Sequence, residues 1–392
     1  MATTDRTLPD DAARAMLVGR AWLPGPLAGP SVVVVRGGEL FDISAVAPTV
    51  AALLAMPDAA AVARNAAGEP LGPLADWLAQ TQRHGPDPRQ RHLLAPNDLQ
   101  VVKAAGVTFA ASMVERVIEE QARGDPAAAA AVRELVVAAV GDDLSRLRPG
   151  SAEAMRVKAL LIERKLWSQY LEVGIGPDAE IFTKAPPMAS VGTGVAVGLH
   201  PASVWNNPEP EVVLAVSPAG QVVGAALGND VNLRDFEGRS ALLLGKAKDN
   251  NASCAIGPFI RLFDEHYTLD DLRQAEIRLT VEHADGYRLE GRSSMAQISR
   301  DPLDLVEHMM GATHQYPDGA MLFCGTMFAP IEDRDAPGAG FTHHVGDVVT
   351  VAEARLGALV NRVDHSDRLP PWQFGIVALM RNLAARGLLG GE

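Results

Sequence analysis

Two short apolar runs divided by a glycine pair lie near the start of the chain. They make up residues 31–44, which read SVVVVRGGELFDIS. Paired glycines between apolar runs are typical of a β-hairpin, because glycine adopts turn conformations that other residues avoid. A short helix is expected over residues 48–56. Residues 65–97, rich in Pro, Gly and Arg and without a clear period, are interpreted as a linker that closes a small β-rich N-terminal domain over residues 1–90.

The next part of the chain has a helical pattern. It begins at Ser112, which is followed three positions later by Glu115, a capping-box arrangement ahead of an apolar-periodic run. The Ala-rich residues 127–140 and residues 152–166 predict two more helices. We interpret this block, about residues 112–168, as a helical insertion between two β units.

The pattern changes to short strands from about residue 171 onward. Turn residues separate these strands, and Asp301 followed by Pro302 is typical of the start of a helix. Strands are predicted over residues 211–217, 221–227, 275–281, 287–292, 321–325 and 345–351, and helices over residues 301–310 and 372–389. The mixture of separate helical and strand-rich blocks predicts an α+β fold.

Composition and charge narrow the classes of function. The chain has 392 residues, enough for two or three domains, and its 47% hydrophobic and 21% charged residues are ordinary for a soluble globular protein. The formal net charge of −13 argues against a nucleic-acid partner. The N-terminus shows no secretory signal, and the longest apolar stretch, residues 127–140, is too short and too charged to span a membrane. Two cysteines without a CxxC pair favour a reducing compartment, so we expect a cytoplasmic enzyme without a membrane partner.

Three carboxylates form the first candidate site. Glu209 and Glu211 are two positions apart in a predicted strand, so their side chains point to the same face. Pro210 between them favours an extended chain. The next strand folds back and ends at Asp230, which would supply a third oxygen ligand. Such a set suits Mg²⁺ or Mn²⁺. The alternative is two solvent-facing glutamates and an aspartate in a turn.

Further polar residues follow the carboxylates. Lys248 beside a metal site could hold a substrate carboxylate, stabilise an enolate or, with a lowered pKa, act as a base. A surface lysine is the alternative. We interpret other reactive residue types without a catalytic role: His314, His343 and His344 as polar surface residues, and Cys254 and Cys324 as small core residues.

Taken together, these residues resemble the fumarylacetoacetate hydrolase superfamily. The matching pieces are EPE at 209–211, LGNDVNLRD at 227–235, KDNNASCAIGP at 248–258 and FCGT at 323–326. They occur in the family's order, and the resemblance covers roughly residues 93–360. It implies a mixed β-sheet roll of the family's C-terminal type within a catalytic domain over residues 91–392. It also implies that Glu209, Glu211 and Asp230 bind Mg²⁺ or Mn²⁺, and that the protein is a homodimer or homotetramer.

One departure from the family pattern bears on the reaction. Hydrolases of the family carry a G-x-N-Y-x-x-H-x-x-E segment, whose histidine and glutamate activate water for C–C cleavage. The matching stretch here keeps Glu115 but has Ser112 at the histidine position. A serine without a partner base activates water poorly, which puts C–C hydrolysis in doubt. A capping box explains the same two residues without any catalytic role, and the sequence leaves both readings open.

Other segments resemble the branch of the family that dehydrates 2-keto-3-deoxy sugar acids. They are GVTF at 106–109 followed by S..ER at 112–116, GPDAEIFTK at 176–184 and GNDVNLRDFEGRS at 228–240. The resemblance implies conversion of a 2-keto-3-deoxy-D-pentonate to 2-oxoglutarate semialdehyde and water. The metal would chelate the substrate's carboxylate and 2-oxo oxygen and stabilise an enolate, after which the C4 hydroxyl leaves.

Further roles follow from the same resemblance. Proton transfer is assigned to Glu180 and Glu115, and pairing with the enolate or carboxylate to Lys248, although these roles could be exchanged. Substrate binding is assigned to Ser112, Ser253, Gly325 and Thr326. One alternative function is a C–C hydrolase of 2,4-dioxo acids, such as an acylpyruvate or a diketo-deoxy sugar acid. A non-enzymatic binding or scaffold protein with a decayed site is the other.

Overall fold

The centre of the fold is strand β10 (Pro210–Val216), which is buried on both faces. Val212 and Leu214 belong to one hydrophobic cluster, whereas Val213 and Ala215 belong to another. Because successive side chains of a strand point to opposite faces, a strand covered on both sides is apolar throughout. The run EVVLAV therefore encodes a central strand rather than a half-exposed one.

The structure is a computed structural model that describes residues 7–123, 125, 147–163, 167–336 and 340–389. Eleven strands of these residues form one large sheet. In spatial order ten of them are β4 (Glu69–Pro73), β3 (Glu39–Asp42), β2 (Gly29–Arg36), β1 (Leu17–Leu23), β13 (Cys254–Leu262), β11 (Val222–Asp230), β10, β16 (Ala320–Phe323), β6 (Val101–Gly106) and β7 (Glu180–Ala185). The eleventh strand, β5 (His92–Leu94), pairs with β1.

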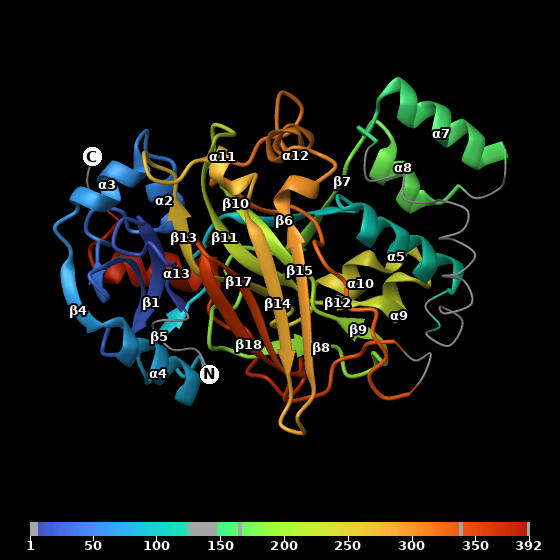
Figure 1. Cartoon of the computed structure of the whole chain (residues 1–392). Coiled ribbons are helices and arrows are strands. Elements are labelled where there is room, and N and C mark those ends of the chain that lie inside the picture. The colour runs from blue at the N-terminus through green and yellow to red at the C-terminus, as the bar shows by residue number, and fades with distance from the viewer. Residues whose placement is uncertain (1–6, 124, 126–146, 164–166, 337–339, 390–392) are drawn as a thin grey trace.

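A second sheet packs across β10 and β11 (Figure 1). Its order is β15 (Arg288–Ser294), β14 (Glu276–Glu282), β17 (Val348–Glu353), β18 (Gly357–His365) and β8 (Val197–Leu199). Leu279 and Val351 of this sheet pack in the same cluster as Val212 and Leu214 of β10. Strands β9 (Asn206–Asn207) and β12 (Asn232–Leu233) form a separate two-stranded ribbon. The main core therefore lies between two mixed sheets.

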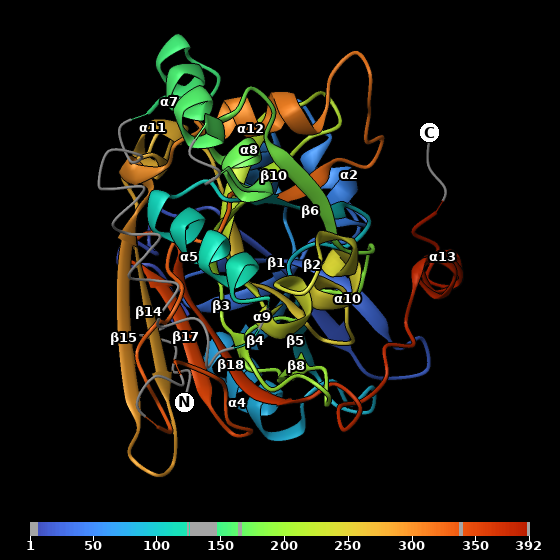
Figure 2. The same ribbon diagram turned by 90° about the vertical axis from the view of Figure 1, so that its right-hand side faces the viewer.

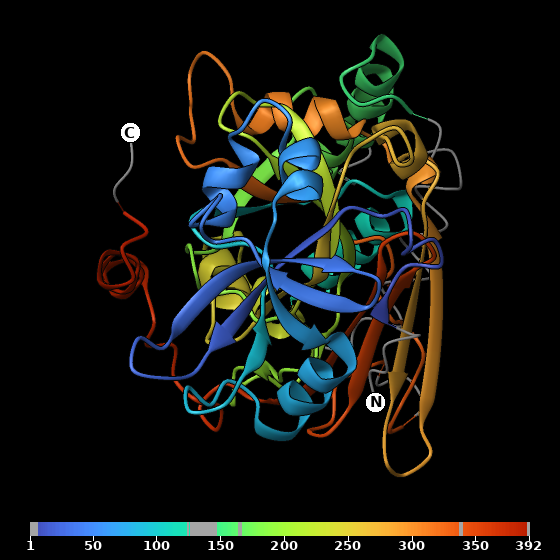
Figure 3. The same ribbon diagram turned by 90° about the vertical axis from the view of Figure 1, so that its left-hand side faces the viewer.

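Helices cover the edges of the sheets. Helices α2 (Val50–Leu54), α3 (Ala59–Asn65) and α4 (Leu74–His84) lie beside the N-terminal strands, seen face-on in Figure 3. Helices α5 (Ala110–Gln121), α7 (Ala152–Glu163) and α8 (Gln169–Ile175) lie at the opposite end, with α9 (Arg234–Glu237) and α10 (Leu244–Lys248) next to α5 (Figure 2). The remaining helices are α11 (Leu269–Leu272), α12 (Pro302–Met309) and α13 (Ile376–Ala385). Among the described residues, none of the helices is long and apolar enough to cross a membrane.

Most of the predicted elements are confirmed. The hairpin at residues 31–44 is β2 and β3, the helix at 48–56 is the shorter α2, and α12 begins after Asp301 as its N-cap with Pro302 at its start. The helix predicted over 127–140 lies outside the described residues. The other predicted strands and helices correspond to β10, β11, β14, β15, β16, β17, α7 and α13.

Two predictions about local structure are wrong. Residues 65–97 are not a linker, because they contain β4, α4 and β5. Leu74, Trp77 and Leu78 of α4 are buried at helical spacing against the N-terminal strands. The prediction of a capping box at Ser112 is also wrong, because α5 begins at Ala110 and has Phe109 at its N-cap. Ser112 is therefore an interior position of the helix.

The N-terminal strands are hydrogen-bonded to the rest of the chain. β1 pairs antiparallel with β13, with Leu17 opposite Arg261 and Val18 opposite Ile260. The guanidinium of the buried Arg261 also binds the carboxylate of Asp11 at 2.5 and 2.8 Å. The boundary predicted near residue 90 thus falls within a continuous sheet, and two separate domains stay a prediction.

Candidate active site

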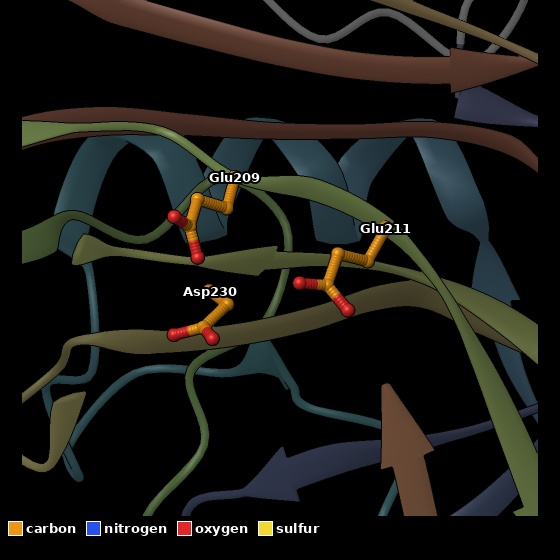
Figure 4. A group of neighbouring side chains, drawn as sticks. All are labelled: Glu209, Glu211 and Asp230. Atoms are coloured by element: carbon orange, nitrogen blue, oxygen red, sulfur yellow. The ribbon is translucent and has the colours of Figure 1, made fainter. Parts of the chain in front are cut away.

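Three carboxylates come together at the end of the β10–β11 hairpin. Glu211 lies in β10, Glu209 directly precedes that strand, and Asp230 ends β11. The backbone N–H of Asp230 donates to the carbonyl of Glu209 at 3.0 Å, which fixes the strand ends side by side. One oxygen from each carboxylate lies within 4.8 Å of the others, and all three residues are buried (Figure 4). The structure therefore groups the three residues that the sequence predicted as metal ligands.

Cations and a backbone donor surround these carboxylates. The Lys248 Nζ lies 2.5 Å from Glu209 Oε2 and 3.0 Å from Asp230 Oδ2. The Nζ of Lys184, which is fully buried, lies 2.8 Å from Asp230 Oδ1. Every trio member therefore has a partner, since the N–H of Gly325 donates to Glu211 Oε2 at 2.7 Å. A side chain at Gly325 would collide with Thr108, and its φ of 103° also favours glycine.

A second layer of charges extends from Glu209 to the helices. The Arg116 guanidinium of α5 pairs with Glu209, and its Nη1 lies 2.7 Å from Glu119 Oε2 and 2.9 Å from Glu237 Oε2. The Nε of Arg234 lies 3.1 Å from Glu119 Oε1. All of these side chains are buried, so each charge depends on its partners for stability.

The charges of the whole cluster leave room for a divalent cation. Six carboxyl groups face four cations, so acidic groups outnumber basic ones and the cluster favours an added cation such as Mg²⁺ or Mn²⁺. The carboxylates are Glu119, Glu180, Glu209, Glu211, Asp230 and Glu237, and the cations are Arg116, Lys184, Arg234 and Lys248. An all-oxygen donor set is also the one that these hard cations prefer. The residues therefore fit the predicted metal.

The surroundings shift the pKa values of two trio members in opposite directions. Burial disfavours charge on Glu209, but Arg116 and Lys248 outweigh burial and lower its pKa to about 2. Burial, followed by repulsion from Asp230 and Glu209, raises the pKa of Glu211 well above the ordinary value. Burial also opposes the charge on Lys248, but the neighbouring carboxylates raise its pKa. One ligand is thus held ionised by the protein, whereas Glu211 has no ion pair among the described residues and Lys248 only partly offsets the effects that raise its pKa.

The cluster opens into two adjoining cavities. The inner cavity has a volume of about 10 Å³ and the outer cavity about 120 Å³. The inner one is lined by the metal trio together with Arg116, Tyr170, Glu180, Phe182, Glu237, Lys248 and Thr326. Tyr170, Glu180 and Glu237 also line the outer cavity, so these three residues stand between the two spaces.

Two further carboxyl groups at this junction have unusual surroundings. Glu180 begins β7 opposite Gly106 of β6, and a side chain at Gly106 would collide with its carboxyl oxygen. Burial and repulsion from Glu237 raise the pKa of Glu180 from 4.5 to about 7. Burial also raises the pKa of Glu237, although the positive charge of Arg116 opposes that shift. A carboxyl group with a pKa near neutrality, as Glu180 has, is suited to proton transfer.

Of the other predicted residues, some line the inner cavity and some lie away from it. Thr326 lines the inner cavity and forms a side-chain hydrogen bond to Glu209. The Ser253 hydroxyl lies behind the site, where it donates to the Lys248 carbonyl at 2.8 Å and accepts from the Asn250 N–H at 2.9 Å. That hydroxyl therefore supports the turn after Lys248. Glu115 is half-buried on α5 and is not among the described residues that line the two cavities.

The sequence analysis missed residues that the structure puts at the site. They are Arg116, Tyr170, Lys184 and Glu237. Arg116, Lys184 and Glu237 fall within the segments that resemble the dehydratase branch, but nothing in a single sequence says that they are buried. The cysteines are buried core residues, as predicted. His343 is not a surface residue, because it is buried with its Nδ1 2.8 Å from Asp347 Oδ2. His344 is partly exposed, and within the described residues the metal trio is the single group with the geometry to hold an ion.

Residues 187–364 match the family model described as the fumarylacetoacetate (FAA) hydrolase C-terminal domain. This segment contains the metal trio and Lys248, and it follows the order of motifs noted above. Over these residues, which are fewer than half of the chain, the protein is similar to the fumarylacetoacetate hydrolase superfamily. The α+β fold and the mixed sheet of this superfamily are therefore confirmed.

Two similar proteins are named as dehydratases. The chain is 26% identical over 273 residues to a probable 2-keto-3-deoxyxylonate dehydratase of Haloferax volcanii, covering 70% of this chain and 75% of the relative. It is 29% identical over 187 residues to a 2-dehydro-3-deoxy-D-arabinonate dehydratase of Saccharolobus solfataricus, covering 47% of this chain and 58% of the relative. The second match therefore spans little more than half of that protein.

Solved structures of 2-keto-3-deoxy-D-arabinonate dehydratase share the fold. An apo 2-keto-3-deoxy-D-arabinonate dehydratase superposes with a TM-score of 0.61 at 17% identity, covering 89% of this chain and 99% of the other. A structure of 2-keto-3-deoxy-D-arabinonate dehydratase complexed with magnesium and 2,5-dioxopentanoate gives a TM-score of 0.60 at 17% identity, with the same two coverages. At such low identity the likeness establishes the fold alone.

Proposed function

We propose that this protein is a Mg²⁺-dependent dehydratase that converts a 2-keto-3-deoxy-D-pentonate to 2-oxoglutarate semialdehyde (2,5-dioxopentanoate) and water. The observation that carries the proposal is the buried trio of Glu209, Glu211 and Asp230, which lies beside a cavity lined by further carboxyl groups. The names of both dehydratase relatives support the substrate class, as does the magnesium and 2,5-dioxopentanoate complex of the solved dehydratase.

The trio provides the binding end of the site. A Mg²⁺ held by these carboxylates would act as a Lewis acid on the 2-oxo group of the substrate. Lys248 remains paired with Glu209 and Asp230, so its ammonium is suited to pairing with substrate oxygens rather than to accepting a proton. Thr326 and the backbone at Gly325 lie beside Glu209 and Glu211, where they would orient the substrate carboxylate.

The remaining cavity residues provide the reacting end. Dehydration removes a proton from C3 and the hydroxyl from C4, so it requires a proton acceptor and a proton donor near those carbons. Glu180 has a pKa near 7 and faces both cavities, which suits it to one of these tasks. Tyr170 of α8 also faces both cavities, where its ring would exclude water from the reacting carbons of a bound substrate.

Turnover of a defined substrate tests this proposal. Purified protein with Mg²⁺ is incubated with 2-keto-3-deoxy-D-arabinonate, and the semialdehyde is followed with a coupled dehydrogenase. We expect product formation that EDTA abolishes and that Glu209→Ala reduces by at least about 100-fold, since loss of a ligand weakens metal binding and charge stabilisation.

The matched control is Glu307→Ala, which removes an exposed glutamate of α12 and should leave the rate unchanged. No semialdehyde from the pentonate, together with release of a carboxylic acid from an acylpyruvate, would replace the dehydratase by the C–C hydrolase. Equal activity with and without EDTA would contradict the role of the trio.

The proposal includes a cytoplasmic location and a homodimer or homotetramer without nucleic-acid or membrane partners. The net charge of −13 and the two buried free cysteines support this setting. Light scattering coupled to size-exclusion chromatography measures the subunit number, and a monomeric mass at micromolar concentration would contradict the oligomer.

A further inference from the structure

Two carboxyl groups stand where a substrate would pass from the inner to the outer cavity. Glu180 and Glu237 line both spaces, whereas Glu209, Glu211 and Asp230 line only the inner one. A chain that binds through its 2-oxo acid end at the trio therefore places its next carbons between Glu180 and Glu237. The dehydration needs proton-transfer groups at C3 and C4, the two carbons that follow the 2-oxo carbon along the chain.

We infer that Glu237 and Glu180 form the acid–base pair of the site, in which Glu237 removes the C3 proton and Glu180 protonates the departing C4 hydroxyl. The inference rests on the proposed function. It assigns a catalytic role to Glu237, and it replaces Glu115 as the second proton-transfer group.

The surroundings of the two carboxyl groups decide which is the base. Glu237 Oε2 lies 2.9 Å from Nη1 of the buried Arg116, and this ion pair favours the carboxylate form of Glu237. Among the described residues Glu180 has no ion pair, and its carboxyl group packs against Gly106. A proton shared by the pair therefore resides on Glu180, which makes Glu180 the donor and Glu237 the acceptor.

Helix geometry explains why Glu115 is not part of the pair. Glu115 precedes Arg116 on α5, and adjacent helical residues point about 100° apart. Arg116 lines the inner cavity and binds Glu209, so Glu115 points away from that direction.

The pair returns to its starting state in one turnover. Glu237 accepts the C3 proton, the C3–H electrons form a C2=C3 bond, and the 2-oxo oxygen receives the electron pair. The electrons on that oxygen then re-form C2=O, and the C2=C3 electrons move to form C3=C4. The C4–O bond breaks at the same time, and Glu180 gives its proton to the departing hydroxyl, which leaves as water. Glu180 is now a carboxylate and Glu237 is protonated.

The second half of the reaction reverses the two roles. The Glu180 carboxylate removes a proton from C5, which is acidic because C3=C4 conjugates it with the 2-oxo group. The C5–H electrons form C4=C5, and the C3=C4 electrons form a new C3–H bond with the proton from Glu237. The product is the C5 enol, which becomes the aldehyde when a proton moves from its hydroxyl to C4. Glu180 again carries the proton, and no other reactant is required.

Isotope exchange separates the two roles. The Mg²⁺-loaded wild type and variants are incubated with the 2-keto-3-deoxy-D-pentonate in D₂O, and NMR follows deuterium at C3 of the remaining substrate together with semialdehyde formation. Glu180→Gln should lose at least about 100-fold in dehydration but still exchange C3, because Glu237 remains able to remove and return that proton. Glu237→Gln should lose both exchange and dehydration by at least about 100-fold.

Glu307→Gln is the control. Glu307 is exposed on α12 and does not line either cavity. This variant removes a carboxylate outside the charged layer and should leave both rates unchanged. Glu237→Asp keeps a carboxylate and should recover part of the exchange, which separates a chemical role from damage to the fold.

The outcomes are distinguishable from failure of the proposed function. A Glu237→Gln protein that exchanges and dehydrates like the wild type overturns the pair. Exchange that survives in Glu237→Gln but is lost in Glu180→Gln overturns the assignment of base and acid. A wild type that neither exchanges C3 nor forms semialdehyde overturns the dehydratase itself.

Discussion

At the scale of single residues, the site collects charges that a folded protein ordinarily excludes. Glu180 illustrates the cost, because its pKa of about 7 means that the folded protein holds a proton more tightly than the unfolded chain, whose value is near 4.5. Ionisation of this buried carboxyl therefore does not lower the free energy of unfolding below pH 4.5. It lowers that free energy increasingly as the pH rises to 7, and the effect is complete above pH 7. Allowing for its partial exposure, that cost is about 2 kcal/mol.

This sign gives a pH-dependent stability prediction for Glu180→Gln. The metal-free variant should be more stable than the metal-free wild type by about 2 kcal/mol at pH 8, because glutamine resembles the protonated acid at every pH. The difference should vanish near pH 4.5. Urea unfolding in EDTA at several pH values measures it, and Glu307→Gln on the exposed face of α12 is the control. A difference that does not change with pH would contradict the raised pKa.

The sequence predicted part of the site for a physical reason. Glu209 and Glu211 point the same way because they are two apart in a strand, and the hairpin register brings Asp230 beside them. Arg116 and Glu237 were missed because only the packing of α5 and α9 against the strand ends buries their charges. The family motif that matched Glu115 says nothing of the direction in which that residue points.

At the scale of elements, contacts from distant segments hold short helices in place. Helix α2 has five residues, too few to be stable alone. Thr49 caps it locally, but its first two N–H groups, at Val50 and Ala51, donate to the carboxylate of Asp98 at 2.6 and 3.0 Å. Asp98 lies between β5 and β6, so it ties α2 to the main sheet.

Loss of the hydrogen bonds from α2 to Asp98 should destabilise the protein more than loss of the local cap at Thr49. Asp98→Ala should lower the free energy of unfolding by about 3 kcal/mol, because it leaves two buried N–H groups unsatisfied and removes the charge that faces the buried Arg20. Thr49→Ala should cost about 1 kcal/mol. Urea unfolding measures both, and activity per folded molecule should stay unchanged. Equal effects of the two variants would contradict the tie.

Element length explains which parts of the fold the sequence predicted. Strands β10 and β14 and helix α12 are long enough for an apolar period or a cap to be visible. Strand β5 has three residues and β4 has five, and the buried positions of α4 are flanked by glycine and proline, so residues 65–97 were mistaken for a linker. Non-local pairing, such as β1 with β13, leaves no mark on either strand alone.

At the scale of the whole molecule, that pairing bears on how many units the chain contains. β1 joins the N-terminal strands to β13, and β13 is the neighbour of β11, which ends at the metal ligand Asp230. β13 is buried along its whole length, so removal of β1 would expose an apolar strand edge. Opening the N-terminal part alone is therefore unfavourable, and the whole chain is expected to unfold together.

Tryptophan placement allows this expectation to be tested directly. Trp22 and Trp77 lie in the N-terminal part, whereas Trp167, Trp205 and Trp372 lie outside it. In a variant with phenylalanine at the last three positions, fluorescence reports on the N-terminal part, and circular dichroism reports on the whole chain. Both signals should give the same urea midpoint, and Mg²⁺ at 100 times its dissociation constant should stabilise both by about 2.7 kcal/mol.

A second variant that keeps only Trp205, near the active site, is the matched control and should give the same midpoint. If Mg²⁺ shifts the Trp205 signal and leaves the Trp22 and Trp77 signal unchanged, the N-terminal part unfolds by itself and the boundary near residue 90 separates two domains. If all signals shift together, the continuous sheet carries the stabilisation from the metal ligands to β1. The hydrogen-bonded path from Asp230 through β11 and β13 favours the second result.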